Sequence, residues 1–228
     1  LWGFGPAGRR IEAPAAATLQ EAMARTGWQR VEMDAPGART RKPPEVSVDL
    51  SSLGKGRGVD RVSAYLLSQG LSDHLIDLSG KLRAHGRNAR GEPWQVAVET
   101  PGPDDASGEP RVATGPVALR DEAIATAGTY RRYFLDDGRH YSHLIDTRTG
   151  HPIAFDTVSA TVLAADALQA DALCTVLMLL PPEEALAFAE RRGVAALLLR
   201  ERNGNLEQLA TSQWLERENR NAQPKEGA

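Results

Sequence analysis

The residues best suited to chemistry are Asp171 and Thr175, four positions apart in a segment whose apolar residues have helical spacing over 167–180. Side chains with this separation share one face of a helix. A carboxylate and a hydroxyl are hard oxygen donors, which suit Mg²⁺ together with phosphate oxygens and water. Alternatively, Asp171 only stabilises the start of the helix through the helix dipole. The spacing leaves both interpretations open.

A second candidate is the sequence DLSSLGKGRG over 49–58. Alternating residues over 46–50 predict a strand, the glycines over 54–58 predict a turn, and the apolar spacing from Val59 predicts a helix ending at Gly70. Such a turn lets a ligand approach the backbone, and Lys55 near a helix N-terminus supplies charge for a phosphate. Neither common phosphate-binding glycine spacing is present, so the residues alone favour an ordinary strand–turn–helix corner.

A third candidate pairs His143 with Asp146. A histidine and a carboxylate three residues apart can orient each other, or act as a base and its partner. The simpler interpretation is a loop in which Asp146 accepts backbone amides and His143 packs, and the residues alone favour it. The single cysteine, Cys174, is expected to pack as a small hydrophobic residue.

The elements that would position these residues mix helices and strands without strict alternation, which is typical of the α+β class. We expect helices over 14–27, 59–70, 167–180 and 183–192, and strands over 46–50, 75–78, 94–98, 123–126, 157–163 and 194–200. Turns are expected at 136–138 and 203–204, a linker over 34–45, a polar loop over 101–110, and a frayed polar tail from about 216.

Composition narrows the possible functions. The chain has 228 residues, 41% of them apolar, which suits one domain with a real core. A net charge of −3 argues against a large nucleic-acid surface, and no apolar stretch approaches the roughly 18 residues of a membrane helix. The single cysteine excludes an internal disulfide framework. The opening Leu1-Trp2-Gly3-Phe4 is a run normally found inside a fold, so we expect a processed or truncated chain.

Six segments taken in order resemble the ApbE family of FAD:protein FMN transferases, also called flavin transferases. They are LWGFGP at 1–6, VDLSSLGKGRGVDR at 48–61, LIDLSGKLRAHGR at 75–87, AIATAGTYRRYF at 123–134, HLIDTRTGHPI at 143–153 and VSATVLAADALQADALCTVLMLL at 158–180. The resemblance implies one T-fold-like α+β domain over 1–215 with antiparallel or mixed sheets and packed helices. It also implies a polar tail over 216–228, and that the family's N-terminal segment is missing.

The resemblance implies a function as well. Family members use Mg²⁺ to transfer FMN from FAD to a Thr or Ser hydroxyl of a target redox protein, release AMP, and usually work in the bacterial periplasm. By match to the family, the metal would be held by the Ser52 carbonyl, Asp171 and Thr175. Asp49, Lys55 and Ile145 would line the FAD site, and His143 would help to deprotonate the acceptor hydroxyl, a role that Asp171 or the metal could fill instead.

The chain departs from the family pattern at four positions. Ser142 replaces a common histidine, Thr147 a proline, Ala127 a hydroxyl residue, and Lys81 an acidic residue that often follows two glycines. None of these changes removes an implied metal ligand. The changes at Ser142, Ala127 and Lys81 motivate one alternative to transfer, a carrier or assembly factor that binds FAD without transferring FMN. A further alternative is an FAD pyrophosphatase, in which water replaces the protein hydroxyl.

Overall fold

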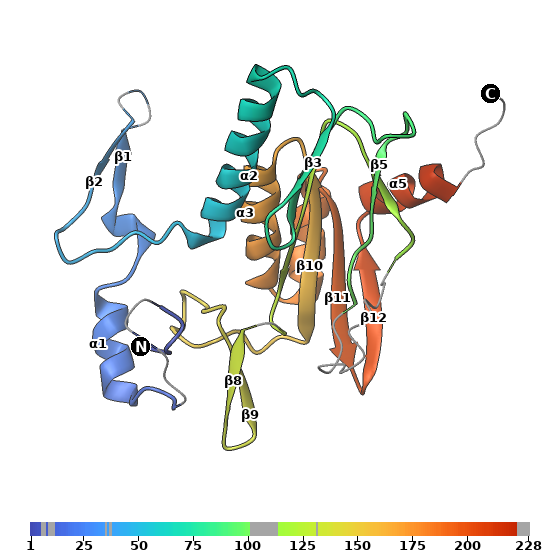
Figure 1. Cartoon of the computed structure of the whole chain (residues 1–228). Coiled ribbons are helices and arrows are strands. Elements are labelled where there is room, and N and C mark those ends of the chain that lie inside the picture. Colours follow the sequence, from blue (N-terminus) through green and yellow to red (C-terminus); the bar gives the residue numbers. More distant parts are fainter. Residues whose placement is uncertain are drawn as a thin grey trace. The chain divides into compact units, whose positions relative to one another are not determined.

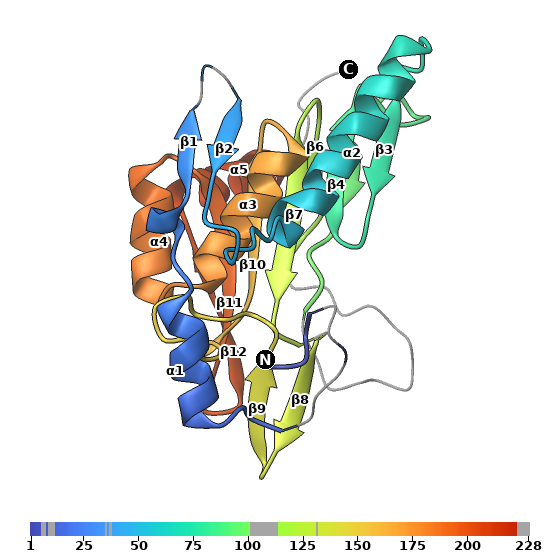
Figure 2. The same cartoon turned by 90° about the vertical axis from the view of Figure 1, so that its left-hand side faces the viewer.

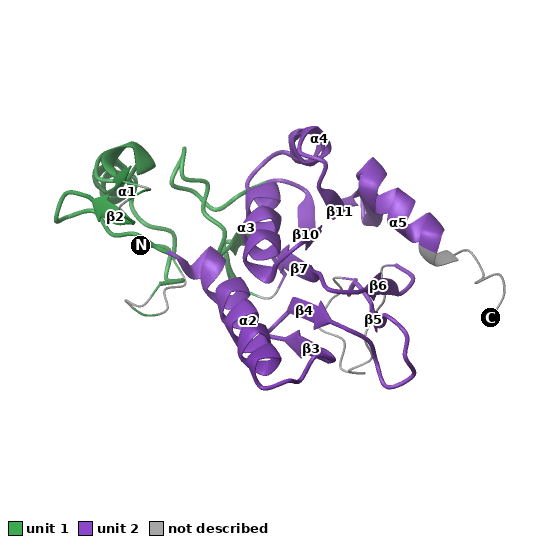
Figure 3. Ribbon diagram, turned by 90° about the horizontal axis from the view of Figure 1, so that it is seen from above, with its two compact units in different colours: residues 1–49, 131–154 green, residues 50–130, 155–228 purple. Residues whose placement is uncertain are grey.

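The computed structural model describes residues 1–5, 8, 12–34, 36, 38–100, 114–130 and 132–222, with the backbone alone at 139, 221 and 222. These residues form two compact units, shown in Figure 3. Unit 1 contains Leu1–Asp49 and Arg131–Ala154, and unit 2 contains Leu50–Tyr130 and Phe155–Ala228. Each unit is described by itself.

Unit 2 is built on a six-stranded antiparallel sheet (Figure 1). From edge to edge the strands are β12 (Asn205–Ala210), β11 (Ala195–Arg202), β10 (Thr157–Ala164), β7 (Ala123–Gly128), β4 (Lys81–His85) and β3 (His74–Asp77). At the centre, β7 and β10 pair from Ala123 opposite Ala164 to Gly128 opposite Ser159. The prediction of an α+β fold with antiparallel sheets is confirmed.

Helices cover this sheet. Four of them belong to unit 2: α2 (Ser51–Ser68), α3 (Ala167–Met178), α4 (Pro182–Arg191) and α5 (Ser212–Ala222). Figure 2 shows α2 and α3 side by side, and α3 contacts β7 and β10. Because α3 buries Ala170, Cys174 and Leu177, its apolar stripe faces the sheet. The sheet therefore fixes the side of α3 on which Asp171 lies.

A second layer contains the two-stranded pair β5 (Trp94–Val96) and β6 (Val117–Leu119), together with α5. Leu119 and Trp214 are fully buried in a core cluster with residues of the large sheet, among them Ile124, Leu163 and Leu197. Side chains of the central strands are thus buried on both faces, as the continuous burial from Ser159 to Leu163 shows.

Unit 1 contains α1 (Ala16–Ala24), a 3₁₀ turn (Trp28–Arg30) and two small hairpins, β1 (Glu32–Asp34) with β2 (Arg39–Arg41), and β8 (Tyr133–Asp136) with β9 (Arg139–Ser142). The apolar start of the chain packs inside it. Trp2 is buried, stacks on Tyr141 with ring centroids 5.3 Å apart, and donates from Nε1 to the Gly150 carbonyl at 2.8 Å. Phe4 packs against Phe134 in a tilted arrangement, with ring centroids 5.7 Å apart.

Several predicted elements were wrong. Residues 46–50 form no strand, and the glycines over 54–58 lie inside α2 and not in a turn before a helix. Part of the predicted frayed tail, up to 222, belongs to α5. The prediction also missed β1, β2, β4, β6 and β12, which are short and give little periodicity. Of these, β2 and its pairing with β1 fall on the predicted linker over 34–45. The predicted loop over 101–110 lies outside the described residues.

Candidate functional site

The candidate site lies where α2 and α3 approach each other in unit 2. A Cβ placed on Gly56 would lie 2.3 Å from the Ala167 carbonyl oxygen and 2.8 Å from the Asp171 Cβ, distances that real atoms do not occupy. Glycine at this position therefore permits the close approach of the two helices. A Cβ on Gly54, half a turn earlier in α2, would meet nothing within 4 Å.

The close approach brings a backbone amide to the Asp171 carboxylate. Asp171 is buried, and its Oδ2 accepts a hydrogen bond of 2.9 Å from the Gly56 N–H. In a regular α-helix this N–H donates to the carbonyl four residues earlier, which is that of Ser52. The Gly56 N–H that Asp171 accepts is thus the one that a regular α-helix pairs with the Ser52 carbonyl. This is the geometric basis for considering the two oxygens together.

Thr175 adds a third oxygen on the same helix face. Its Oγ1 donates to the Asp171 backbone carbonyl at 3.0 Å, a bond within α3 that fixes the hydroxyl beside the Asp171 turn. A hydroxyl has two acceptor lone pairs besides its proton, so this bond leaves its oxygen able to accept or to bind a cation. The predicted sharing of one helix face by Asp171 and Thr175 is confirmed.

Lys81 enters the same buried place from β4. Its Nζ lies 3.3 Å from Asp171 Oδ1, donates to the Thr126 carbonyl, and lies 3.8 Å from Cys174 Sγ. Burial raises the pKa of the Cys174 thiol to about 11, an effect that the nearby Lys81 charge only partly opposes. The cysteine therefore packs as a neutral thiol, and the charges of this cluster are those of Lys81 and Asp171.

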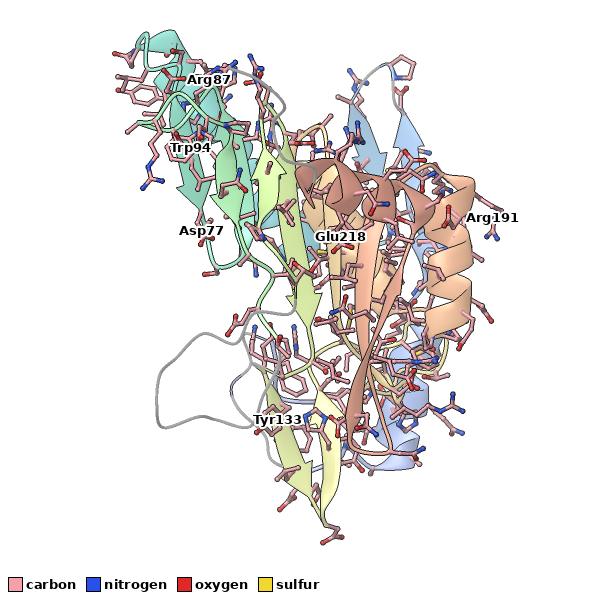
Figure 4. All side chains as sticks on the ribbon, turned by 90° about the vertical axis from the view of Figure 1, so that its right-hand side faces the viewer. Asp77, Arg87, Trp94, Tyr133, Arg191 and Glu218 are labelled. Atoms are coloured by element: carbon pink, nitrogen blue, oxygen red, sulfur yellow. The ribbon has the colours of Figure 1, made fainter. Side chains whose placement is uncertain are left out.

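The turn between β3 and β4 positions Lys81. Ser79 and Gly80 both have positive φ, +52° and +78°, which matches the two-residue hairpin turn with the twist of antiparallel strands. Asp77, labelled in Figure 4 at the end of β3, accepts the Gly80 amide at 2.9 Å. Lys81 follows directly as the first residue of β4. Sequence reasoning noted the lysine but gave no signal of its partner, which is 90 positions away.

The start of α3 is stabilised by other acidic residues. Asp60 of α2 accepts the amides of Ala167 and Leu168, each at 2.9 Å, and Asp166 accepts the Gln169 amide at 2.8 Å. The helix-start role proposed as the alternative for Asp171 is thus filled by Asp166 and Asp60. Sequence reasoning missed Asp60, because its contact spans more than 100 residues.

The oxygen donors fit a hard cation, but the positive charge of Lys81 lies beside them. A carbonyl, a hydroxyl and one carboxylate match the preference of Mg²⁺, which takes one or two carboxylates and keeps its other positions for water and phosphate. Within the described ranges there is no group of three or more His, Cys, Asp and Glu side chains that could hold a metal. The Lys81 ammonium lies 3.3 Å from Asp171 Oδ1, so the carboxylate already faces one positive charge.

Lys55 lies in the second turn of α2 and is exposed, because the helix begins at Ser51 and not after the glycines. The glycine-turn argument for phosphate binding is therefore wrong at 54–58. A helix N-terminus is still present one turn earlier, at Ser51. Lys55 can reach a phosphate only as an exposed side chain on the helix surface.

The other predicted site residues, Asp49, His143 and Ile145, belong to unit 1. Asp49 is exposed, and Ile145 is half-buried and pairs with Pro152. The Nδ1 of His143 lies 3.1 Å from the Arg132 carbonyl, which can only accept a hydrogen bond, so Nδ1 carries a proton.

The structure agrees with the simpler interpretation of Asp146, a loop in which its carboxylate accepts a backbone amide. Its carboxylate accepts the Arg148 amide at 2.9 Å and the Arg148 guanidinium, and these hydrogen bonds lower its pKa. The Gly150 amide donates to the Asp146 carbonyl at 2.7 Å, which closes the turn. Asp146 is thus a turn residue, as the loop interpretation predicts.

The fold is an α+β fold of the kind seen in solved flavinyl transferase structures. The solved structure of the flavinyl transferase ApbE from Pseudomonas stutzeri superposes with a TM-score of 0.83 at 38% identity, over 96% of this chain and 66% of that chain. The FAD:protein FMN transferases of Vibrio cholerae and Haemophilus influenzae are 38% and 37% identical, over 94% and 90% of this chain.

The ApbE family model matches residues 1–198, and the chain belongs to the ApbE family. The chain spans 62% and 59% of the length of the two relatives. No helix within the described residues is long and apolar enough to cross a membrane.

Proposed function

We propose that this chain transfers FMN from FAD to a Thr or Ser hydroxyl of an acceptor redox protein, releases AMP, and uses Mg²⁺. The observation that supports this most directly is membership of the ApbE family, whose relatives at 38% and 37% identity are named FAD:protein FMN transferases. Asp171 and Thr175, which lie on one face of α3 at its approach to α2, offer two of the oxygen donors that such chemistry needs, and we propose the Ser52 carbonyl as the third.

The proposed reaction is a phosphoryl-type transfer. The acceptor hydroxyl oxygen forms a bond to the phosphorus of the FMN half, the bond from that phosphorus to the bridging oxygen breaks, and AMP leaves with the bridging oxygen. Catalysis of such a step depends on stabilising charge on the phosphate oxygens and on positioning the attacking hydroxyl. Bound Mg²⁺ would neutralise part of that charge, and Ser52, Asp171 and Thr175 are the residues that would hold it.

The acceptor hydroxyl must lose its proton. We assign this role to His143, whose Nδ1 donates to the Arg132 carbonyl, so that Nε2 is the ring nitrogen that would take the proton. Asp49, Lys55 and Ile145 are assigned to FAD, with Lys55 as the cation for its phosphates. Because these residues are divided between the two units, separate variants test one residue of each unit, Lys55 in unit 2 and His143 in unit 1.

The test is the intact mass of an acceptor flavoprotein after incubation with the chain, FAD and Mg²⁺. We expect a gain of one FMN, which disappears when Mg²⁺ is chelated and in Asp171→Asn. A matched control is Arg191→Gln at the end of α4, where Figure 4 shows the side chain, and this variant should retain transfer. Lys55→Ala should weaken FAD binding, and His143→Gln should slow transfer more than it weakens FAD binding.

One observation favours a second candidate, the FAD carrier that performs no transfer. The Asp171 carboxylate already has a buried counter-ion in Lys81, so it does not need a metal for charge balance. Bound FAD with neither acceptor labelling nor AMP would establish the carrier. AMP and free FMN with an unmodified acceptor would show the pyrophosphatase reaction instead.

The proposal includes a periplasmic location, which the family resemblance alone supports. The acceptor would then be a redox protein with its flavin-bearing domain in the same compartment. Fractionation of the source cells, with this protein detected by antibody, tests the location. Recovery with the cytoplasmic fraction would contradict it.

A further inference from the structure

Lys81 and Asp171 form a buried ion pair at the candidate site. Their side chains are 5% and 2% exposed, and Lys81 Nζ lies 3.3 Å from Asp171 Oδ1. The other neighbours of the ammonium are the Thr126 carbonyl and the neutral thiol of Cys174. The pair is therefore balanced, one positive charge to one negative charge, without any added ion.

A divalent cation at Asp171 would disturb this balance. The carboxylate has two oxygens, and in this structure Oδ2 accepts the Gly56 N–H while Oδ1 faces the ammonium. A cation bound to the carboxylate would lie close to the Lys81 charge. Charges in a buried, poorly hydrated place interact more strongly than at the surface and are little screened by salt. Holding both the Lys81 ammonium and a divalent cation against the one Asp171 carboxylate therefore has a high cost in free energy.

We propose that Lys81 is an internal competitor for the metal at Asp171, which holds Oδ1 while no metal is bound and must leave it when a divalent cation binds. This inference rests on the proposed function, which places Mg²⁺ at Asp171. It makes Lys81 a positioning residue that sets the Mg²⁺ concentration needed for activity.

The experiment compares metal affinity in the unaltered chain, Lys81→Gln and Lys81→Arg. Mg²⁺ binding is measured by calorimetry, and Mn²⁺ binding by the loss of the free-ion electron paramagnetic resonance signal. Glutamine removes the charge but can still donate to the Thr126 carbonyl, whereas arginine keeps the charge. We expect Lys81→Gln to bind at least about tenfold more tightly than the other two, because one opposing charge is gone.

A second readout is thermal stability. Without Lys81 the Asp171 carboxylate is a buried charge without its counter-ion, so Lys81→Gln should melt lower in chelator and recover on addition of Mg²⁺. The double variant Lys81→Gln/Asp171→Asn removes both charges. It should fold without metal and show no response to Mg²⁺.

The outcomes separate this inference from the proposed function. One result is that the unaltered chain and Lys81→Gln bind the metal with equal affinity while the double variant does not bind it. That result would overturn competition by Lys81, and the metal site at Asp171 would stand. Metal binding that is absent from all variants, or undiminished in the double variant, would overturn the metal site itself and this inference with it.

A measurement on the unaltered chain covers the case in which Lys81→Gln does not fold. The chain has four lysines, so ¹³C-lysine labelling gives four side-chain signals, with that of Lys81 assigned through Lys81→Arg. We expect the Lys81 signal to move during a Mg²⁺ titration with the midpoint found by calorimetry, while exposed Lys42 and Lys55 stay constant. A Lys81 signal that stays constant as metal binds would refute the displacement.

Discussion

Replacing Gly56 with alanine should drive α2 and α3 apart. The added methyl carbon would lie 2.3 Å from the Ala167 carbonyl oxygen, 2.7 Å from its carbon and 2.8 Å from the Asp171 Cβ. Two of these three atoms belong to the backbone, so no side-chain rotation relieves the contact. A normal contact requires the helices to separate by about 1 Å, which would also lengthen the hydrogen bond from the Gly56 N–H to Asp171.

Three effects set the size of the loss. Overpacking of a well-packed place costs about 1–3 kcal/mol. A weakened hydrogen bond to a buried carboxylate costs up to about 1.5–3 kcal/mol, whereas alanine gains about 1 kcal/mol over glycine in a helix interior. The net expectation is that Gly56→Ala lowers the free energy of unfolding by about 2–5 kcal/mol. Any metal at Asp171 would also bind less tightly.

Gly54→Ala is the matched control, because it makes the same chemical change one half-turn away. A Cβ at Gly54 meets nothing within 4 Å, so only the helix-propensity gain applies. We expect this variant to be more stable than the unaltered chain by up to about 1 kcal/mol. The two alanine variants should therefore differ in sign.

The assay is urea unfolding followed by circular dichroism and by the fluorescence of the chain's tryptophans, one of which, Trp214, is buried in unit 2. A shift of the midpoint in opposite directions for the two variants is the expected result. If Gly56→Ala is at least as stable as the unaltered chain, the close packing of α2 on α3 is refuted.

Three further predictions concern single side chains. Asp60→Ala should cost about 1–3 kcal/mol in urea unfolding, because two α3 amides lose a charged acceptor; an unchanged midpoint would contradict that role. Cys174 should resist iodoacetamide at pH 8 in the folded chain and react once unfolded, because its pKa is raised to about 11; rapid modification of the folded chain would oppose this. The hydrogen bonds from Arg148 lower the pKa of the Asp146 carboxyl below 3.8. The stability that these hydrogen bonds give the folded chain is therefore present above that pH and is lost as the pH falls further. Arg148→Gln should therefore lower stability at neutral pH and not in strong acid, and a difference that persists in acid would count against it.

Features with a local cause could be predicted from the sequence. The turns at Asp137-Gly138 and Asn203-Gly204 were predicted from residue types that tolerate positive φ, and all four residues have φ between +47° and +76°. The helix over 167–180 was predicted from apolar spacing, and α3 occupies Ala167–Met178. At these places the local residue types determine the structure.

The failures have long-range causes. Residues 46–50 alternate like a strand, but Val46 is buried while Val48 and Leu50 are 52% and 61% exposed, so the alternation does not describe one buried face. The glycines near Gly56 suggested a turn, whereas one of them is required by the backbone of α3, more than 100 residues away. The pairing of Lys81 with Asp171 spans 90 residues, and no spacing rule predicts such a contact.

The pairing of β7 with β10 has a consequence for how the chain is divided. Gly128 lies opposite Ser159, so the chain leaves and re-enters the sheet at the same end of two neighbouring strands. Residues 131–154 are thus an insertion at a hairpin, and residues 1–49 are an extension that precedes the sheet. A hairpin closed by a four-residue turn in place of this roughly 30-residue excursion would have a loop-closure entropy cost about 2 kcal/mol smaller. Unit 2 is therefore organised as a module that could exchange its inserted part while its sheet and the Asp171 corner stay intact.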